Sequence, residues 1–533
     1  MGAKPPCDEA AILSGPVVVS CSPNVGRWVL TATILGSGMV FIDGSAVNVA
    51  LPVLQRDLDA SATDMQWVIE IYMLFLAALL LIGGALGDRL GRRRVFTWGV
   101  AVFALASVWC GLAPDPSQLI LARAVQGIGG ALLVPGSLAM ISASFDDSAR
   151  GTAIGTWSGA TAITMAAGPV VGGWLAEALS WRWVFFLNIP LAIAVFLIAT
   201  TRLPETRDPL APPNVDWVGA GLSVTGLGAL VYGLVESANL GLMHPLVLGA
   251  IGAGGALLIV FVWVEAHAGV PMMPLDVFRS RSFAGANVLT FLLYGGLGGA
   301  LFFLPFNLIQ VHGYSATEAG AAWLPFILSV GGLSRWTGAL VPVVGARPLL
   351  VVGPLVVAGG FVLAARPGVG GSYWTTFFPA FLAVGLGMAI AVAPLVTVVM
   401  SAAGSHRAGI ASGINNAVSR VAGLVVLAVM GLLVVAVFNQ RLDTRLAELR
   451  MRASVVARFA EERTHLAAAI PPPNATVQEA QALEAAIDDA FIAGFRLAML
   501  SAAGLAVASA IVARFTIAHP AGGRGANRQS LQA

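Results

Sequence analysis

Long apolar stretches separated by short polar segments constrain this sequence more than any other feature. Each stretch offers about 20 residues, and a helix that rises about 1.5 Å per residue crosses a roughly 30 Å hydrocarbon core over that length. Only helices and closed barrels satisfy their backbone hydrogen bonds inside lipid, and these stretches lack the alternation of a barrel strand. We therefore expect an all-α integral membrane protein with about fourteen transmembrane helices. The predicted spans are 28–50, 66–87, 95–113, 118–141, 151–176, 183–201, 217–236, 245–265, 284–307, 318–339, 348–365, 374–399, 408–436 and 490–513.

The composition excludes several classes of protein. Of the 533 residues, 57% are apolar and 11% are charged, whereas a soluble domain carries roughly 25% charged residues. The formal net charge of +2 argues against nucleic-acid binding. Three cysteines and six histidines show no paired spacing, so we expect neither a metal site nor a cofactor. The sequence also lacks a G-x-x-x-x-G-K-[ST] loop, so nothing suggests that the protein uses ATP.

The distribution of basic residues predicts the orientation of the chain. With the N-terminus in the cytoplasm, the short inner segments hold 17 Lys and Arg residues, and the short outer loops hold only Arg56, Arg182 and Arg366. Basic residues concentrate in cytoplasmic loops of membrane proteins. We therefore expect a multi-pass protein of the inner or plasma membrane with both termini in the cytoplasm.

An internal repeat indicates how the helices are organised. The two copies are Gly84-Ala85-Leu86 with Gly91 and Arg93, and, 254 residues later, Gly338-Ala339-Leu340 with Gly345 and Arg347. The offset corresponds to eight predicted helices, which fits two six-helix bundles with two helices inserted between them. The expected parts are a cytoplasmic tail (1–27), an N-terminal bundle (28–202), an insertion with helices 7 and 8 (203–283), a C-terminal bundle (284–514) and a second cytoplasmic tail (515–533).

The one long loop, 437–488, falls on the outer side in this topology. It is predicted to form two amphipathic helices broken by Pro471-Pro472-Pro473, and Thr476 with Glu479 matches a capping box that would open the second helix. The loop is either a lid or vestibule for substrate, or a solvated helical hairpin with no role in transport.

The most specific motif runs from Gly84 to Arg94 and reads G-A-L-G-D-R-L-G-R-R-R. It lies at the inner end of the second helix and in the tight turn after it. Glycines permit the turn, and Asp88 can pair with arginines of the loop or with a neighbouring helix N-terminus. Such pairs can hold one conformation and release another, whereas the alternative is an ordinary positive anchor. The residues of this predicted latch are Gly84, Asp88, Arg89, Gly91, Arg92 and Arg93.

Three ionisable residues inside predicted spans are candidates for proton coupling, because a charge in the bilayer is costly and tends to be functional and paired. Asp43 lies in the outer half of the first span. A carboxyl group held between apolar surroundings and a nearby cation can bind and release a proton as its environment changes. Arg123, expected near the inner start of the fourth helix, is its natural partner. A fixed structural ion pair is the alternative. Glu70 is a second proton site, a contact for cationic substrates, or a residue facing the outer headgroups.

The fifth predicted helix carries glycines spaced four residues apart. Gly155 with Gly159, and Gly168 with Gly172, each form a smooth face that favours close helix packing. Pro169 removes a backbone hydrogen bond and bends the helix, and Gly173 extends the small-residue face. Such a helix suits the boundary between two bundles that move against each other.

These motifs together resemble the major facilitator superfamily, over roughly residues 28–436 and 490–513. The latch motif is similar to its first signature, 121–129 with Pro135 to its fourth-helix motif, and the fifth-helix glycines to the signature of its antiporters. Asp43 with 47–52 resembles the motif of the fourteen-helix drug:proton antiporter branch. Further segments similar to that branch are 181–183, 188–190 and 409–416.

The resemblance implies proton-coupled export of small hydrophobic or cationic drugs or antibiotics, through a site between the bundles near the middle of the membrane. The expected partners are a small-molecule substrate, protons and the lipid bilayer, and the protein is expected to be a monomer. Export of an endogenous metabolite, lipid or siderophore is the alternative function. A membrane-embedded enzyme would need a cluster of His, Asp or Ser nucleophiles at one depth, which the scattered histidines argue against. A receptor or scaffold would not need Asp43 inside the membrane.

Overall fold

The computed structural model describes residues 23–145, 147–207, 215–269, 271, 273–402, 408–449, 451–460 and 462–518. Most of the two predicted tails, 1–27 and 515–533, lies outside these ranges. Within them the chain is helical and has no strand, and thirteen helices are long and apolar enough to cross a bilayer. The tenth predicted span, 318–339, corresponds to α12 (Ala316–Ala321) and the 21-residue α13 (Leu324–Val344). The all-α membrane fold is confirmed, with about fourteen crossings.

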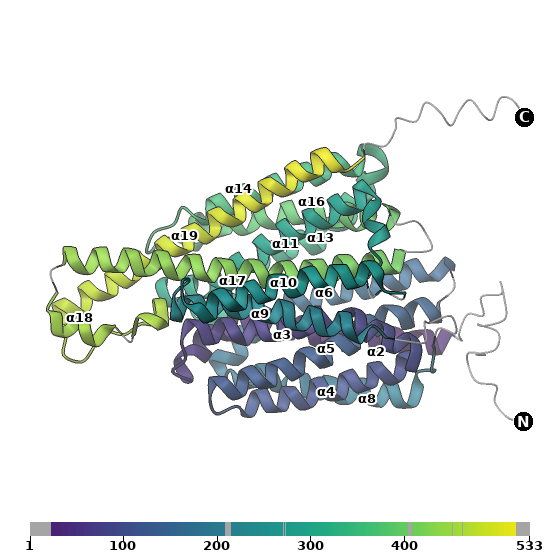
Figure 1. Cartoon of the computed structure of the whole chain (residues 1–533), viewed down its shortest axis with the longest axis horizontal. Helices are drawn as coiled ribbons and strands as arrows, with labels where there is room; N and C mark the ends of the chain where they lie inside the picture. The colour runs from purple at the N-terminus through teal and green to yellow at the C-terminus, as the bar shows by residue number, and fades with distance from the viewer. Residues whose placement is uncertain are drawn as a thin grey trace, which may run out of the picture.

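The helices pack in two groups that lie side by side (Figure 1). The first group contains α2 (Pro23–Asp57), α3 (Ala62–Leu90), α4 (Arg92–Leu112), α5 (Pro116–Ser144), α6 (Asp147–Ala178), α7 (Arg182–Phe186) and α8 (Asn188–Arg202). The second contains α12 and α13 with α11 (Arg281–Phe306), α14 (Ala346–Ala364), α15 (Tyr373–Thr376), α16 (Phe378–Ala402), α17 (Ala408–Glu448) and α19 (Val477–Thr516).

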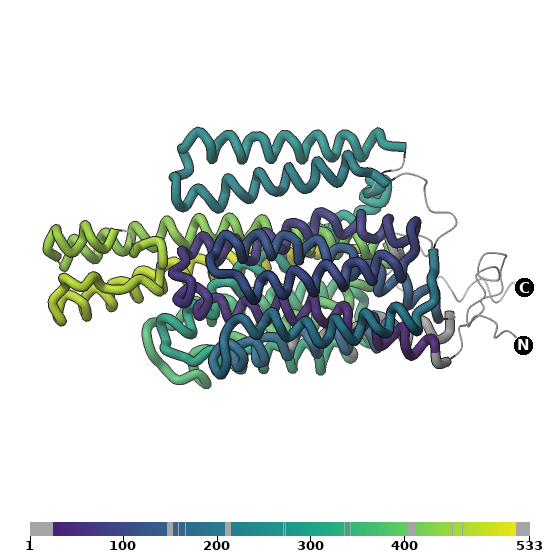
Figure 2. Tube along the Cα trace, turned by 90° about the horizontal axis from the view of Figure 1, so that it is seen from below, coloured from purple at the N-terminus to yellow at the C-terminus, as the bar shows by residue number. Residues whose placement is uncertain are grey.

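A hairpin of α9 (Trp217–Leu240) and α10 (Pro245–His267) lies along one side of both groups (Figure 2). α9 packs against α3 of the first group and α17 of the second, whereas α10 packs mainly on α9. The apolar contact includes Leu74, Val231 and Leu424, one from each of the three helices. At one end Trp67 donates a hydrogen bond of 3.0 Å to Glu236. α9 therefore covers the boundary between the two groups on this side.

Two long helices extend beyond the rest of the molecule (Figure 1). α17 has 41 residues and α19 has 40, so each is about 60 Å long, roughly twice the hydrocarbon core. Their protruding parts are joined through α18 (Ala453–Phe459) and a 3-10 turn, η4 (Glu462–Ala468). This is called the α18 end below, and the opposite end, where α2 begins and α19 ends, is called the termini end.

The structure corrects the expected form of 437–488. Its helices are not a separate pair but continuations of the spanning helices, and Pro471–Pro473 lie in an irregular stretch before α19. The predicted capping box is confirmed, because Thr476 accepts a hydrogen bond from the backbone of Glu479 and Glu479 accepts from that of Thr476. Asp489 of α19 pairs with Arg441 and Arg445 of α17 at 2.9 and 2.8 Å, which joins the two helices.

The predicted repeat is visible in the backbone. Gly91 ends α3 with φ of 111°, and Gly345 ends α13 with φ of 85°. At both positions the backbone N–H closes the last helical turn, on Gly87 and Val341 respectively. Glycine adopts positive φ without steric cost, so the same tight turn follows the corresponding helix in each group.

Topology can be tested with reporters at three positions. A reporter active only in the cytoplasm should be active at either terminus, and one active only outside should be active when inserted near Pro472, because an even number of crossings and the 17-to-3 charge asymmetry predict that the termini lie together inside. Fluorescence and phosphatase fusions measure this. Cytoplasmic activity at position 472 would contradict the predicted orientation.

Candidate functional site

Asp43 lies at the centre of a polar network inside the first helix group. The residue is 1% exposed, and its carboxylate accepts hydrogen bonds from three side chains. Arg123 Nη1 donates to Oδ2 at 2.5 Å, Gln126 Nε2 to Oδ1 at 2.9 Å, and Asn188 Nδ2 to Oδ1 at 3.0 Å. Three donors from two further helices thus surround one carboxylate on α2. The predicted pairing of Asp43 with Arg123 is confirmed.

Further contacts fix the donors themselves. Arg123 is fully buried, and its Nε donates to the carbonyl of Val68 in α3 at 3.1 Å. Its guanidinium lies over the ring of Tyr72, 4.0 Å from the centroid, a cation–π arrangement. Gln126 also donates to Ser107 of α4 at 2.9 Å. Removing one partner from a buried ion pair typically costs about 3–5 kcal/mol, so the network holds these helices in register.

The depth expected for Arg123 was wrong. The fourth predicted span corresponds to α5, which begins at Pro116 after the turn at the α18 end, and Arg123 lies two turns from that start. Three spans precede α5, so the chain must enter it from the side opposite to the N-terminus. Arg123 is therefore at the depth of Asp43, near the end predicted to be outer.

Sequence reasoning gave no role to Gln126, Asn188 or Ser107. All three are fully buried and polar within otherwise apolar spans, which is the signal that could have identified them. Gln126 and Asn188 lie in segments that resemble family motifs. The sequence does not reveal how each helix is rotated about its axis, and that rotation decides whether a polar side chain faces Asp43.

Glu70 faces the interior and not the headgroups, since it is fully buried in the protein. Its Oε1 accepts a hydrogen bond of 2.7 Å from Gln66, which also donates to the carbonyl of Leu427 in α17 at 3.4 Å. No described residue donates to Oε2. Glu70 therefore lies at the contact between the two helix groups, outside the Asp43 network.

The ion pair of the predicted latch joins the end of α3 to the start of α4. Arg92 pairs with Asp88 at 2.7 Å and reaches the carbonyl of Ala139 in α5 at 3.4 Å. Arg89 is exposed. Sequence reasoning gave no role to Glu205, which contacts the other arginines of the turn.

Glu205 follows α8 and lies against the start of α4. It accepts the backbone N–H of Arg93 at 3.0 Å, and the side chains of Arg93 and Arg94 lie 3.6 and 3.8 Å away. A Cβ at Gly91 would come within 2.5 Å of its carboxylate. The latch turn is thus connected to α5 and to the segment after α8. Gly84 packs more loosely, with Pro135 at 3.5 Å from a built Cβ.

The glycines of α6 divide into two sets. A Cβ at Gly168 or Gly172 would collide with Ser45 or Ala46, so α6 and α2 are in backbone contact there, as predicted. The close packing expected at Gly155 and Gly159 is not found, because no described atom of another element lies within 4 Å of a Cβ built at either position.

The two helix groups meet tightly at the α18 end. A Cβ at Gly173 would lie 2.1 Å from the carbonyl oxygen of Ala316, and one at Gly320 would lie 2.1 Å from that of Pro169. Beside this contact, the backbone and hydroxyl of Thr317 donate to Glu177 at 3.0 and 2.5 Å. A further hydrogen bond between the groups runs from the side-chain amide of Gln310 to that of Gln55, at 3.0 Å. This end of the molecule is therefore closed.

Comparison with known proteins agrees with this architecture. Residues 33–427 match the family described as Major Facilitator Superfamily. The chain is 34% identical to the tetracenomycin C resistance and export protein of Streptomyces glaucescens, over 91% of each chain. It is 36% identical to the puromycin resistance protein of Streptomyces alboniger, over 75% of this chain and 80% of that protein. Its fold is similar to the crystal structure of a bacterial homologue of the human lysosomal transporter Spinster, with a TM-score of 0.62, 18% identity, and coverage of 94% and 100%.

Replacing either member of the latch pair should slow transport with little effect on folding. Asp88 and Arg92 are partly exposed, so their pair contributes about 1 kcal/mol or less to stability. We expect Asp88→Asn and Arg92→Gln each to lower the transport rate severalfold, and the double variant to be no slower than Arg92→Gln, since that change already removes the pair and the contact with Ala139. Transport is measured at equal protein in the membrane. A wild-type rate in Asp88→Asn would mean that Asp88 is only part of an anchor.

Gly173→Ala should prevent closure at the α18 end, because the added Cβ would meet backbone of α12 that cannot move aside cheaply. We expect severalfold slower transport and faster maleimide labelling of a cysteine placed at Thr317 in a variant with serine at the three native cysteine positions. Gly159→Ala is the matched control on the same helix, since its Cβ would enter open space. Equal labelling in the two variants would contradict the role assigned to the α6–α12 contact.

Proposed function

Because the chain belongs to the major facilitator superfamily, we propose that it exports small hydrophobic or cationic antibiotic-like compounds in exchange for protons. Family membership rests on a match across 33–427 and on relatives above 30% identity along most of the chain. These findings make it a multi-pass membrane transporter of small molecules. The export of antibiotics is supported by relatives named for antibiotic resistance and export.

The observation that carries the proton-coupling proposal is the buried Asp43 network. In this buried site, protonation of Asp43 would remove the negative charge that balances Arg123, so the pair cannot change its charge without rearranging its neighbours. The amide partners suit this change, since an amide can donate to a carboxylate and accept from a carboxylic acid. Asn188 Oδ1 has no hydrogen-bond partner among the described residues. Rotation of that amide would offer an acceptor to protonated Asp43.

The position of the network gives a direction to the cycle. We place the α18 end outside and both termini in the cytoplasm of a cell-membrane protein, on the basis of the arginine asymmetry. Asp43 would then receive its proton from outside when the α6–α12 contact opens, and release it inward after that contact closes. One proton moving inward across 100 mV releases about 2.3 kcal/mol, which can drive export of the substrate.

The moving parts in this proposal are two six-helix bundles, 28–202 and 284–514, of a monomer. They would rock about a substrate site between them, with 203–283 as the inserted pair. The latch turn at Asp88 and the glycines 168, 172 and 173 of α6 would stabilise alternate positions of the bundles. Glu70 is the second candidate for proton coupling, since it is buried at the contact between them.

Asp43→Asn should abolish substrate-driven proton flux in reconstituted vesicles, because an amide neither binds nor releases a proton in the physiological range. Substrate binding should survive, since the amide has nearly the same shape. Asp43→Glu should retain part of the flux with a changed pH dependence, because the longer side chain alters the contact with Arg123. Flux is measured across pH, with a substrate identified by growth protection of pump-deficient cells.

The matched control for this experiment is Asp59→Asn. Asp59 carries the same side chain, is fully exposed and has a positive φ that asparagine tolerates. Its flux should equal that of the wild type. Undiminished flux in Asp43→Asn would remove Asp43 as an essential carrier and make Glu70 the next candidate.

A further inference from the structure

Arg420 is a cation in the interior of a spanning helix of the second group. Helix α17 begins at Ala408, and a rise of about 1.5 Å per residue puts Arg420 about 18 Å along it. This is near the middle of the predicted span 408–436. A charged side chain at such a depth is costly unless it has a partner or reaches water.

The face of α17 that carries Arg420 is turned toward α3 of the first group. One contact precedes Arg420 by seven residues, since a Cβ at Gly413 would lie 3.5 Å from the side chain of Leu81. Another follows it by seven residues, since the carbonyl of Leu427 accepts a hydrogen bond from Gln66 at 3.4 Å. Seven residues are close to two helical turns, so Arg420 lies on the same face, between the two helix groups.

Arg420 lacks an anionic partner within the part of the chain that the structure describes. No described residue there accepts a hydrogen bond from it or pairs with it, and the ionisable side chain near it is Tyr72 of α3. The other arginine in the middle of the molecule, Arg123, donates to Asp43 and to the carbonyl of Val68. Arg420 is also partly exposed, whereas Arg123 is fully buried. Its guanidinium is therefore open to an anion from outside the chain.

Three further polar residues lie beside Arg420 on α17. Ser412, Asn416 and Ser419 precede it by eight, four and one residues, and none of the three is buried. Asn416 donates to the backbone carbonyl of Ser412, and Ser419 donates to that of Asn416, so these bonds stay within the helix. The rest of the span, 421–438, has no polar side chain. Accessible polar groups at this depth face water or a polar ligand and not lipid.

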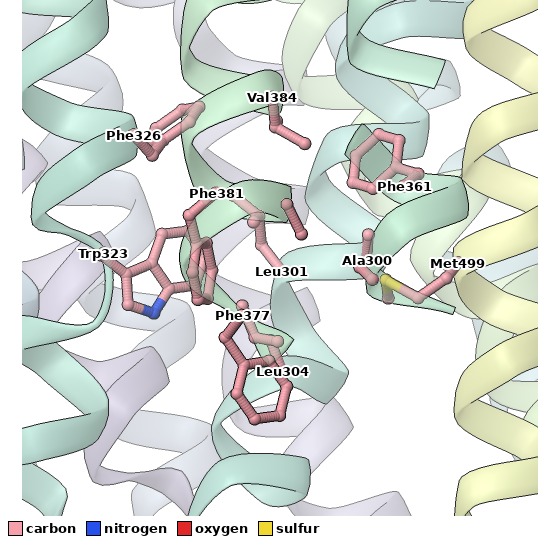
Figure 3. Close-up of a pocket in the computed structure, with 12 residues that line it drawn as sticks. Ala300, Leu301, Leu304, Trp323, Phe326, Phe361, Phe377, Phe381, Val384 and Met499 are labelled. Carbon is pink, nitrogen blue, oxygen red and sulfur yellow. The ribbon is translucent and has the colours of Figure 1, made fainter. Parts of the chain in front are cut away.

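The interior of the second group has no room for a ligand (Figure 3). The rings of Trp323, Phe326, Phe377 and Phe381 meet there around a space of about 30 Å³. Ligand pockets measure roughly 300–1,000 Å³. A ligand that reaches this group would therefore bind on the side that faces the first group, where Arg420 lies.

We infer that Arg420 binds the carboxylate of an exported compound at the contact between the groups. A guanidinium can hold a carboxylate through two parallel hydrogen bonds, and the anion supplies the charge that Arg420 lacks. Close by, a Cβ at Gly423 would lie 3.0 Å from the flexible end of Met73, a side chain that adapts to apolar surfaces. The inference rests on the proposed export function and narrows its substrates to hydrophobic compounds that carry an acidic group.

The test compares three probes of similar size, the anion 2-naphthoate, the neutral 2-naphthamide and the cation 2-naphthylmethylammonium. Binding is measured at neutral pH on the full chain in phosphatidylcholine nanodiscs, with empty nanodiscs subtracted. A hydrogen bond to a charged group corresponds to a difference of about tenfold or more in Kd, so the wild type should prefer naphthoate to the amide by at least that factor. Equal binding of acid and amide would overturn the inference. Tighter binding of the cation would also overturn it and would favour Glu70 as the substrate contact.

Two variants at Arg420 and one control make the result specific. Arg420→Gln should abolish the preference for naphthoate, and Arg420→Lys should keep part of it, because lysine keeps the charge and loses the paired donors. Arg496→Gln is the matched control, since Arg496 is an exposed arginine of α19 that donates to the carbonyl of Pro367. It should keep the full preference. A preference that survives in Arg420→Gln would contradict the inference.

The thermal transition distinguishes a binding residue from a structural one. Removing a cation that has no partner should leave the transition of Arg420→Gln unchanged or raise it, because the cost of holding that charge inside the membrane is gone. A transition clearly below that of Arg496→Gln would give Arg420 a structural role and would count against the inference.

Proton flux driven by the probes in vesicles separates this inference from the export function. Exchange of a monoanion for one proton moves two charges across the membrane, whereas exchange of the amide moves one, so naphthoate flux should depend more steeply on the membrane potential. A higher KM for naphthoate in Arg420→Gln, with kcat retained, would support both proposals. Arg420-dependent binding by a wild type that drives no flux with any probe would support the site and refute export. Flux in the wild type with naphthoate binding that does not depend on Arg420 would refute the site alone.

Discussion

A buried ion pair between Asp43 and Arg123 fixes the arrangement of the helices near it. Inside a bilayer neither charge can be left alone, so each must find its partners within the protein. The partners come from α2, α3, α4, α5 and the start of α8, and each side chain is held by at least one other member. Hydrophobic burial cannot select such a register, because lipid tails are as apolar as leucine. The polar network selects it, and the glycine contacts between α6 and α2 let the backbones approach closely enough to close the bundle.

Much of this could be predicted from the sequence, because a bilayer leaves few options. Span length, the internal repeat and the pairing of the two buried charges each follow from the cost of polar groups in lipid. The rest depended on information that an apolar span does not contain. A helix that is apolar on all sides has no preferred face, so the orientation of Gln126 and Asn188 toward Asp43 could not be deduced. The depth of Arg123 was wrong for a simpler reason, since it required counting crossings and not reading composition.

The prediction for the segment 437–488 was wrong for a different reason. Its charged residues indicated a loop, yet they stabilise helices that continue from the membrane, because Arg441 and Arg445 of α17 share Asp489 of α19. Hydropathy marks where lipid ends and does not mark where a helix ends. Likewise Gly155 and Gly159 have the spacing of packing residues without a partner in this structure, because spacing alone does not say which face meets another helix.

The protruding pair α17 and α19 has a mechanical consequence. Both helices belong to one group, and their protruding parts are joined by ion pairs, so they form a stiff lever with arms of about equal length inside and beyond the membrane. The arm outside is about 30 Å long, and a tilt of about 10° would move its tip by about 5 Å. The turn η4 also contacts the other group, because the side-chain amide of Gln55 in α2 donates a hydrogen bond of 3.1 Å to the carbonyl of His465. A small rotation of this group within lipid would therefore produce a displacement of similar size in water, at a place where a membrane-impermeant ligand could resist it.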